Sequence, residues 1–407
     1  MSEQLDDAYV VAGFEFSGIA AGIKQNKKLD LCLITSNPPA QVVGSFTTNL
    51  VQAAPVLVSK KNIRSGLCSA VITNSGNANA CTGAQGLRDA RAMVQKTART
   101  LKVAEKQVLV CSTGKIGIPL PIKQILKKIP EAVDQLSSSH FLRSAEAILT
   151  TDQSIKIARA EGKIGGVSYR IAGFAKGAGM IEPHMEMAGK HATMLAYILT
   201  DIAIPRSLLK SLFGETIQNT FNRISVDGDT STNDTALMLA NGCAQNRPFA
   251  RQSPEGRQFA KNLFIVMESL AKQMVIDGEG ATKCVKIDIC GAKNNTEARK
   301  LAYTIANSPL VRTSFFGKDP NWGRVLGAAG RAGVALNPDK VDIFYGPVCI
   351  ARRGTSTGIA KDRAAKEVMQ SQEFTVRVDC HLGKGFFSVY TSDLTLDYVK
   401  INSCYRT

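Results

Sequence analysis

The chain has 407 residues, of which 44% are hydrophobic and 21% charged, an ordinary globular composition that excludes wholesale disorder. Its net charge is +16, but the basic residues are scattered, which favours a diffuse field that attracts small acidic substrates over nucleic-acid binding. No apolar run approaches the roughly 18 residues of a membrane helix, and the start, MSEQLDDAYV, has no signal-peptide pattern. We therefore expect a cytoplasmic protein without membrane or nucleic-acid partners.

Hydrophobic periodicity predicts several elements in chain order. Apolar residues at helical spacing predict helices over 87–101 and 259–274, the second preceded by a start signal at 253–255. Alternation predicts strands over 167–171, 374–378 and 386–390. Strand and helix signals alternate throughout, so we predict a mixed α/β (α+β) fold, and the length predicts two domains.

Glycines gather in polar segments along the chain. Small polar residues beside glycine let the backbone approach a ligand and present N–H groups, so we expect these loops to converge on a site. The segments are 75–80, 112–114, 176–179, 227–230, 278–280 and 317–323.

Three familiar kinds of site are disfavoured. The ten cysteines stand singly, without a CxxC pair, and are interpreted as reduced thiols rather than disulfides or zinc ligands. Residues 354–358 match the GxSxG pattern, but a polar turn is favoured over Ser356 as a nucleophile. Residues 182–191 hold four possible metal ligands at a spacing that matches no standard site, so we expect no metal there.

A hydroxyl nucleophile without a histidine base remains. An N-terminal threonine can use its own α-amine as the base, because the pKa of that amine is about 7.7–8.0. A cut before Thr193, which follows a glycine-rich loop and precedes an apolar run, would create one. From the residues alone, an ordinary helix start at Thr193 remains the alternative.

Nine motifs and the C-terminal segment 401–407 occur in an order that resembles the ornithine acetyltransferase family, also called glutamate N-acetyltransferase. The likeness spans nearly the whole chain. The motifs are 44–49, 74–83, 112–117, 150–152, 176–181, 192–195, 226–234, 278–283 and 316–324.

The resemblance implies a two-domain fold with the active site between the domains. The implied domains are an N-terminal domain of residues 1–192 and a C-terminal domain of residues 193–407. The resemblance further implies that Thr193 cuts the Ala192–Thr193 bond, so that these two domains become separate chains that assemble as a heterotetramer. The implied reaction moves an acetyl group from N2-acetylornithine to glutamate through acetyl-Thr193, in arginine biosynthesis. No cofactor is implied, and acetyl-CoA enters only if the enzyme is bifunctional. A same-fold acyltransferase with other substrates, or an unprocessed non-catalytic homologue, is the alternative.

The resemblance also assigns roles to residues. Thr193 matches the nucleophile, and Thr113 and Gly114 match the oxyanion pair. Substrate-contacting positions are Thr151, Lys176, Thr193, Glu279, Asn402 and Thr407. By residue type, Lys176 is expected to bind a carboxylate and Glu279 an amino group.

Two features depart from the family pattern. Residues 186–191 form an insertion just before the cleavage bond, and Lys115 stands where an apolar residue is usual. The first bears on self-cleavage, and the second adds a cation beside the oxyanion region.

Overall fold

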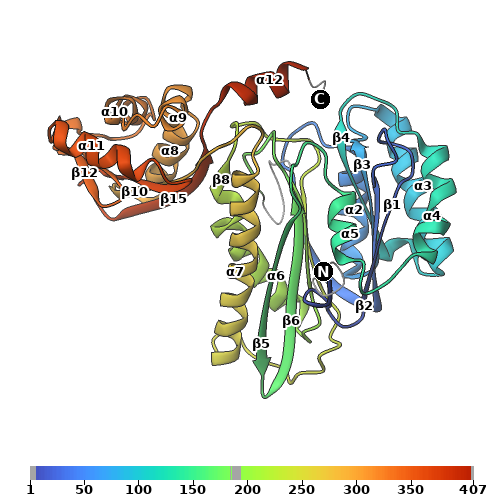
Figure 1. Cartoon of the computed structure of the whole chain (residues 1–407). Helices are drawn as coiled ribbons and strands as arrows, with labels where there is room; N and C mark the ends of the chain where they lie inside the picture. The colour runs from blue at the N-terminus through green and yellow to red at the C-terminus, as the bar shows by residue number, and fades with distance from the viewer. Residues whose placement is uncertain (1–5, 184, 186–193, 405–407) are drawn as a thin grey trace. The chain divides into compact units, whose positions relative to one another are not determined.

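The computed structural model describes residues 6–183, 185 and 194–404. The chain forms two compact units (Figure 1). Unit 1 contains the chain up to residue 222 together with 229–274, and unit 2 contains 223–228 together with 275–406. The mixed α/β class is confirmed. The predicted cut between residues 192 and 193 falls within the residue range of unit 1. The division into two processed chains stays a prediction.

Unit 1 is built on one sheet, which has eight strands among the described residues. The strand order is β4-β3-β2-β9-β7-β6-β5, with β1 paired to β2. The strands are β1 (Phe14–Ile19), β2 (Leu31–Phe46), β3 (Leu67–Asn77), β4 (Val108–Lys115), β5 (Lys156–Ile164), β6 (Val167–Lys176), β7 (Leu195–Thr200) and β9 (Thr235–Ala240). The helices that begin in this unit are α2 (Ala54–Asn62), α3 (Gly83–Leu101), α4 (Ile122–Asp134), α5 (Phe141–Ala147), α6 (Arg206–Asn219) and α7 (Pro254–Ile276).

Both faces of this sheet are buried at its centre. Side chains alternate along a strand, so Leu31 and Leu33 of β2 join one hydrophobic cluster with residues of α3 and α4. Cys32 and Ile34 join another, with Phe141 of α5. Strands that are apolar on both faces read as continuous hydrophobic runs, which places them inside a layered domain.

The predicted stripe over 259–274 is confirmed as the buried face of α7. All five apolar side chains of the stripe are fully buried. Helix α7 lies along β5 and β6 (Figure 1), where Asn262 Nδ2 donates to the Glu161 carbonyl at 2.8 Å and to the Tyr169 hydroxyl at 3.0 Å. Among the described residues, no helix combines the length and apolarity needed to span a membrane.

Unit 2 has its own sheet, in the order β13-β12-β11-β14-β10-β15-β8. Its strands are β8 (Ile224–Ser225), β10 (Cys284–Ala292), β11 (Asp342–Tyr345), β12 (Val348–Arg352), β13 (Thr355–Ser356), β14 (Glu373–Asp379) and β15 (Gly385–Ser392). Its helices are α8 (Asn295–Ala306), α9 (Pro309–Phe316), α10 (Trp322–Gly330), α11 (Ile359–Val368) and α12 (Leu396–Cys404).

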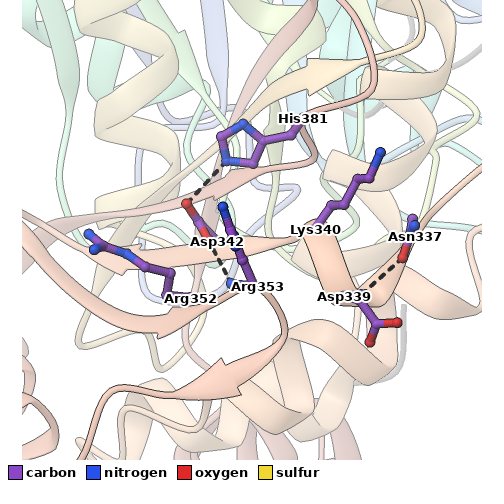
Figure 2. A pocket seen from close by; sticks show the side chains of 7 residues that line it. All are labelled: Asn337, Asp339, Lys340, Asp342, Arg352, Arg353 and His381. Carbon is purple, nitrogen blue, oxygen red and sulfur yellow. Dashed lines mark hydrogen bonds and ion pairs between the residues drawn. The ribbon is translucent and has the colours of Figure 1, made fainter.

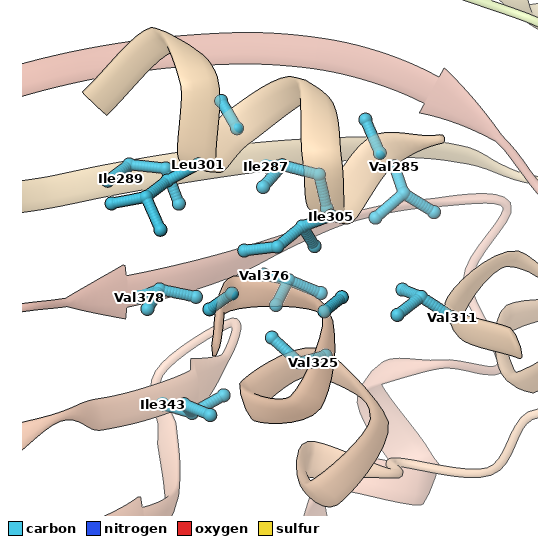
Figure 3. Packing of buried hydrophobic residues seen from close by; sticks show 14 of the residues in the cluster. Val285, Ile287, Ile289, Leu301, Ile305, Val311, Val325, Ile343, Val376 and Val378 are labelled. Atoms are coloured by element: carbon cyan, nitrogen blue, oxygen red, sulfur yellow. The ribbon is translucent and has the colours of Figure 1, made fainter. Parts of the chain in front are cut away.

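The core of unit 2 forms between its sheet and α8 (Figure 3). Val285, Ile287 and Ile289 on alternate positions of β10 pack with Leu301 and Ile305 of α8. The strands predicted over 374–378 and 386–390 lie within β14 and β15. Alternation in the sequence therefore marks the faces that this unit buries.

Candidate active site

The two residues predicted as the oxyanion pair lie at the end of β4, which runs parallel to β3. Gly114 faces Gly76 across this pair, and Ser112 faces Asn74, whose Oδ1 accepts from the Ser112 hydroxyl at 2.6 Å. Gly114 has a φ of +128°, and a Cβ on it would lie 2.4 Å from the carbonyl carbon of Gly76. Only glycine fits such a position. With Thr113 also buried, the backbone here is fixed before any substrate arrives, as an oxyanion site requires.

Asn233 connects this strand end to the segment before β9. Its Nδ2 donates to the Ser112 carbonyl at 2.8 Å and to the Ala78 carbonyl at 2.6 Å. One amide thus ties the ends of β3 and β4 to the chain that leads into the centre of the sheet.

The predicted cleavage bond and its nucleophile, Thr193, lie outside the described residues, so the surroundings of β7 give the relevant geometry. Leu195, the first residue of β7, faces Lys176 on β6 and Thr235 on β9. The Thr235 N–H donates to the carbonyl of Met194 at 2.8 Å. The chain that follows Thr193 is therefore held between two neighbouring strands.

Lys176 ends β6 and is nearly fully buried. Its Nζ donates to the Thr150 hydroxyl at 2.8 Å and lies 3.6 Å from one carboxylate oxygen of Asp152. The other carboxylate oxygen accepts from Lys156 Nζ and from the Gly177 N–H, each at 2.7 Å. One carboxylate is thus shared by two buried ammonium groups.

This sharing decides the charge of the cluster. Burial by itself would raise the pKa of the Asp152 carboxyl, but Lys176 and Lys156 outweigh burial and hold the pKa well below its ordinary value of 3.8. The cluster therefore carries an excess positive charge, which suits Lys176 to binding a carboxylate. Thr151, the predicted substrate contact between Thr150 and Asp152, is half-buried.

Asp234 is a second buried carboxyl that the sequence analysis did not single out. It directly precedes β9 and is fully buried, and neither carboxyl oxygen has a hydrogen-bond partner among the described residues. Burial raises its pKa well above 3.8, and the charge of Lys176 opposes this only in part. An acidic residue directly before the apolar run 235–240 was the sequence signal for it.

Two predicted substrate contacts meet in unit 2. Asn402 Nδ2 of α12 donates to Glu279 Oε2 at 2.8 Å, and Glu279 is 7% exposed. The Gly280 carbonyl, which follows Glu279, accepts from the Thr395 hydroxyl at 2.7 Å. The structure thus joins two motifs far apart in sequence, while Thr407 lies outside the described residues.

Unit 2 also contains an open pocket of about 600 Å³ (Figure 2). Asp342 accepts from His381 Nε2 at 3.1 Å and from the Arg353 N–H at 2.8 Å. Among the described residues, none of the site residues predicted from the sequence lines this pocket. The lining residues are Asn337, Asp339, Lys340, Asp342, Arg352, Arg353 and His381.

Ser356 gains no support as a nucleophile, and the expectation of no metal in residues 182–191 stays a prediction. Ser356 is exposed in the two-residue strand β13, and its hydroxyl accepts from the Gly358 N–H at 3.1 Å, as in a polar turn. In the segment with four possible metal ligands, His184, Glu186 and His191 lie outside the described residues.

Comparison with known proteins identifies relatives over the whole chain. The ArgJ family model matches residues 15–407. The arginine biosynthesis bifunctional protein ArgJ of Geobacter sulfurreducens is 47% identical, over 98% of this chain and 100% of that protein. The protein of the same description from Syntrophotalea carbinolica is 45% identical, over 98% and 99%.

A solved structure agrees with these relatives. The crystal structure of the arginine biosynthesis bifunctional protein ArgJ from Bacillus halodurans has 38% identity and a TM-score of 0.50, covering 52% of this chain and 100% of that chain. The motif resemblance is thus confirmed at the level of the family: the chain belongs to the ArgJ family and is an acyltransferase of arginine biosynthesis.

Proposed function

We propose that the chain transfers an acetyl group from N2-acetylornithine to glutamate through acetyl-Thr193, after cutting its own Ala192–Thr193 bond. The observation that carries the proposal is the arrangement at the start of β7. The chain that follows Thr193 pairs with Lys176 on one side and Thr235 on the other. A buried cation for a substrate carboxylate is thus held beside the strand that the nucleophile precedes.

Self-cleavage needs only the chain itself and water. The Thr193 hydroxyl oxygen attacks the Ala192 carbonyl carbon, its proton moves to the departing nitrogen, and an ester replaces the amide. Water then hydrolyses that ester, leaving a carboxylate on Ala192 and a free α-amine on Thr193. That amine becomes the base for the transfer reaction.

Acetyl transfer uses the same hydroxyl twice. The α-amine accepts the hydroxyl proton as Thr193 attacks the acetyl carbonyl, and N–H donors at Thr113 and Gly114 meet the oxyanion. The tetrahedral intermediate collapses, the proton passes to the leaving nitrogen, and ornithine departs. The glutamate α-amine then attacks the acetyl ester by the reverse path, releasing N-acetylglutamate. None of these reaction steps needs a cofactor.

Substrate recognition divides by charge. Lys176 binds the α-carboxylate that donor and acceptor share, and Thr151 contacts the substrate beside it. Glu279 binds the side-chain ammonium of ornithine, with Asn402 orienting its carboxylate and Thr407 adding a further contact. The hydrogen bond from Asn402 to Glu279 supports this part of the assignment.

Mass spectrometry of the purified protein tests the proposal. Two fragments split at 192–193 are expected, and N2-acetylornithine alone should add one acetyl group to the fragment that begins with Thr193. An uncut chain would favour an unprocessed, non-catalytic homologue. Acylation by another donor but not by N2-acetylornithine would favour an acyltransferase with different substrates. Acetyl-CoA belongs among the donors tested, since the relatives are described as bifunctional.

The processed chains are proposed to remain together in the cytoplasm as a heterotetramer of two α and two β chains. Strands from both sides of the cut share one sheet, which supports their association. Native mass spectrometry should give the mass of two copies of each fragment.

A further inference from the structure

Lys24 lies in the turn between β1 and β2, and a single carboxylate fixes this turn. Asp30, which is fully buried, accepts N–H bonds from Ala21 at 2.5 Å, Ile23 at 2.6 Å and Lys24 at 2.9 Å. The Lys24 ammonium donates to the Leu29 carbonyl at 2.8 Å. The backbone and the side chain of Lys24 are therefore both held in place.

The stem of Lys24 lies beside the predicted oxyanion strand. A Cβ built on Gly76 would lie 3.1 Å from Lys24 Cγ and 3.2 Å from Ile23 Cγ2. Gly76 faces Gly114 in the pairing of β3 with β4. Lys24 is therefore separated from the predicted oxyanion pair by a single glycine.

The charge of Lys24 lacks a close counterpart. No carboxylate forms an ion pair with its ammonium among the described residues, and the carboxylate of Asp30 is occupied by backbone N–H groups. Burial lowers the pKa of Lys24 to about 8; Asp30 and Asp152 oppose this, while the positive charges of Lys176 and Lys28 lower it further. A half-buried cation without an anion is costly, and a ligand carboxylate would relieve that cost.

We propose that Lys24 binds the side-chain carboxylate of the glutamate acceptor and so determines acceptor specificity. The inference rests on the proposed function, in which Lys176 binds the α-carboxylate. The donor has one carboxylate and the acceptor has two, so a second cation near the reacting carbonyl serves only the acceptor.

The test compares glutamate with glutamine, which has the same length but no side-chain charge. Acetyl-enzyme is formed from N2-acetylornithine, and its discharge by each acceptor is timed for the wild type and for Lys24→Met. We expect Lys24→Met to lower the preference for glutamate over glutamine about 10- to 100-fold, the worth of one charge-assisted hydrogen bond. Formation of acetyl-enzyme should stay within about twofold of the wild type.

Three further variants separate recognition from folding. Lys28→Met removes an exposed lysine from the same turn and should keep the wild-type preference. Lys24→Arg keeps the charge and should retain part of the preference. Lys24→Gln replaces Lys24→Met if the methionine variant does not fold, because it keeps a polar group that can donate to the Leu29 carbonyl.

An unchanged preference in Lys24→Met overturns the inference. Equal losses in acetyl-enzyme formation and discharge also overturn it, because Lys24 would then serve a group that both substrates share, or the scaffold. If the wild type forms no acetyl-enzyme from N2-acetylornithine, the proposed function fails by itself. In that case, calorimetry with glutamate and glutamine tests the role of Lys24. The inference predicts that Lys24→Met weakens the binding of glutamate but does not change the binding of glutamine.

Discussion

At the scale of single residues, the site is defined by close contacts and by buried charges. Gly114 has no room for a Cβ, while Asp152 and Asp234 are two buried carboxyls with opposite pKa shifts. The difference has a clear cause: two ammonium groups lie near Asp152, whereas neither oxygen of Asp234 has a hydrogen-bond partner among the residues described. Substitution of each of these three residues should have a measurable effect.

Gly114→Ala should disable the proposed oxyanion site at the end of β4. The new Cβ would lie 2.4 Å from the backbone of Gly76, so the strand end must shift and its N–H donors with it. Losing one such donor typically lowers turnover about 100- to 1,000-fold. Gly117→Ala is the matched control, because Gly117 also has positive φ but has no atom within 4 Å of a Cβ. Similar turnover in the two variants would contradict the assignment.

Asp152→Asn should destabilise the fold by about 3–5 kcal/mol at neutral pH, because it removes a buried carboxylate that pairs with the buried ammonium of Lys156 at 2.7 Å. The folded-state pKa of Asp152 lies below its ordinary value, so its stabilisation is complete above about pH 4 and declines as the pH falls further. Urea unfolding should show a large difference from the wild type at about pH 7 and a smaller one at about pH 3. A difference independent of pH would contradict this account.

Asp234→Asn should behave in the opposite way. The folded-state pKa of Asp234 is raised, so folding is progressively disfavoured as the pH rises above the ordinary value of 3.8. This penalty grows by about 1.4 kcal/mol per pH unit until the folded pKa is reached. The stability of Asp234→Asn relative to the wild type should therefore increase from about pH 5 to about pH 7 in urea unfolding. A constant difference would show that Asp234 is ionised in the folded protein.

At the scale of secondary structure, local periodicity predicted the elements whose burial repeats along the chain. The helices over 87–101 and 259–274 lie within α3 and α7, and the strand over 167–171 lies within β6. Pairing between distant strands leaves no such periodic trace. The sequence therefore could not reveal that Lys176 faces Leu195 across β6 and β7.

The same limit applies to the site. Ordered motifs identified Thr113, Gly114, Lys176, Glu279 and Asn402 as candidates. Lys24 was not among them, because its proposed role rests on the position of its side chain beside Gly76 of β3 and on its partial burial. Neither property can be read from the residues around Lys24.

Helix α7 offers a matched pair of substitutions. Leu263 is fully buried and should cost about 2–5 kcal/mol when replaced by alanine, through lost burial and the cavity left behind. Ile265, two positions along the helix, is 46% exposed, and Ile265→Ala should change stability by only about 0.5 kcal/mol. Thermal unfolding of both variants measures the difference. Equal losses would mean that α7 buries a different face.

At the scale of the whole molecule, the proposed cut divides the strands of one sheet between two fragments. Strands β2 and β6 precede residue 192, while β7 and β9 follow it, and the pairs β2·β9 and β6·β7 cross the division. The two fragments should elute together in native gel filtration, at the volume expected of the uncut Thr193→Ala chain. They should separate only in denaturant. Fragments that elute separately without denaturant would contradict this strand order.

The position of β7 and β9 between β2 and β6 also sets an order of events in time. The first 192 residues alone would present two unpaired strand edges with a gap between them, and such edges promote aggregation. Insertion of the later strands before the proposed cut would avoid exposing these edges. Under the proposed mechanism, only a chain that has completed this sheet can hold Thr193 ready to cut. Activation would then act as a check on folding, because a molecule that misassembles never produces its own catalytic amine.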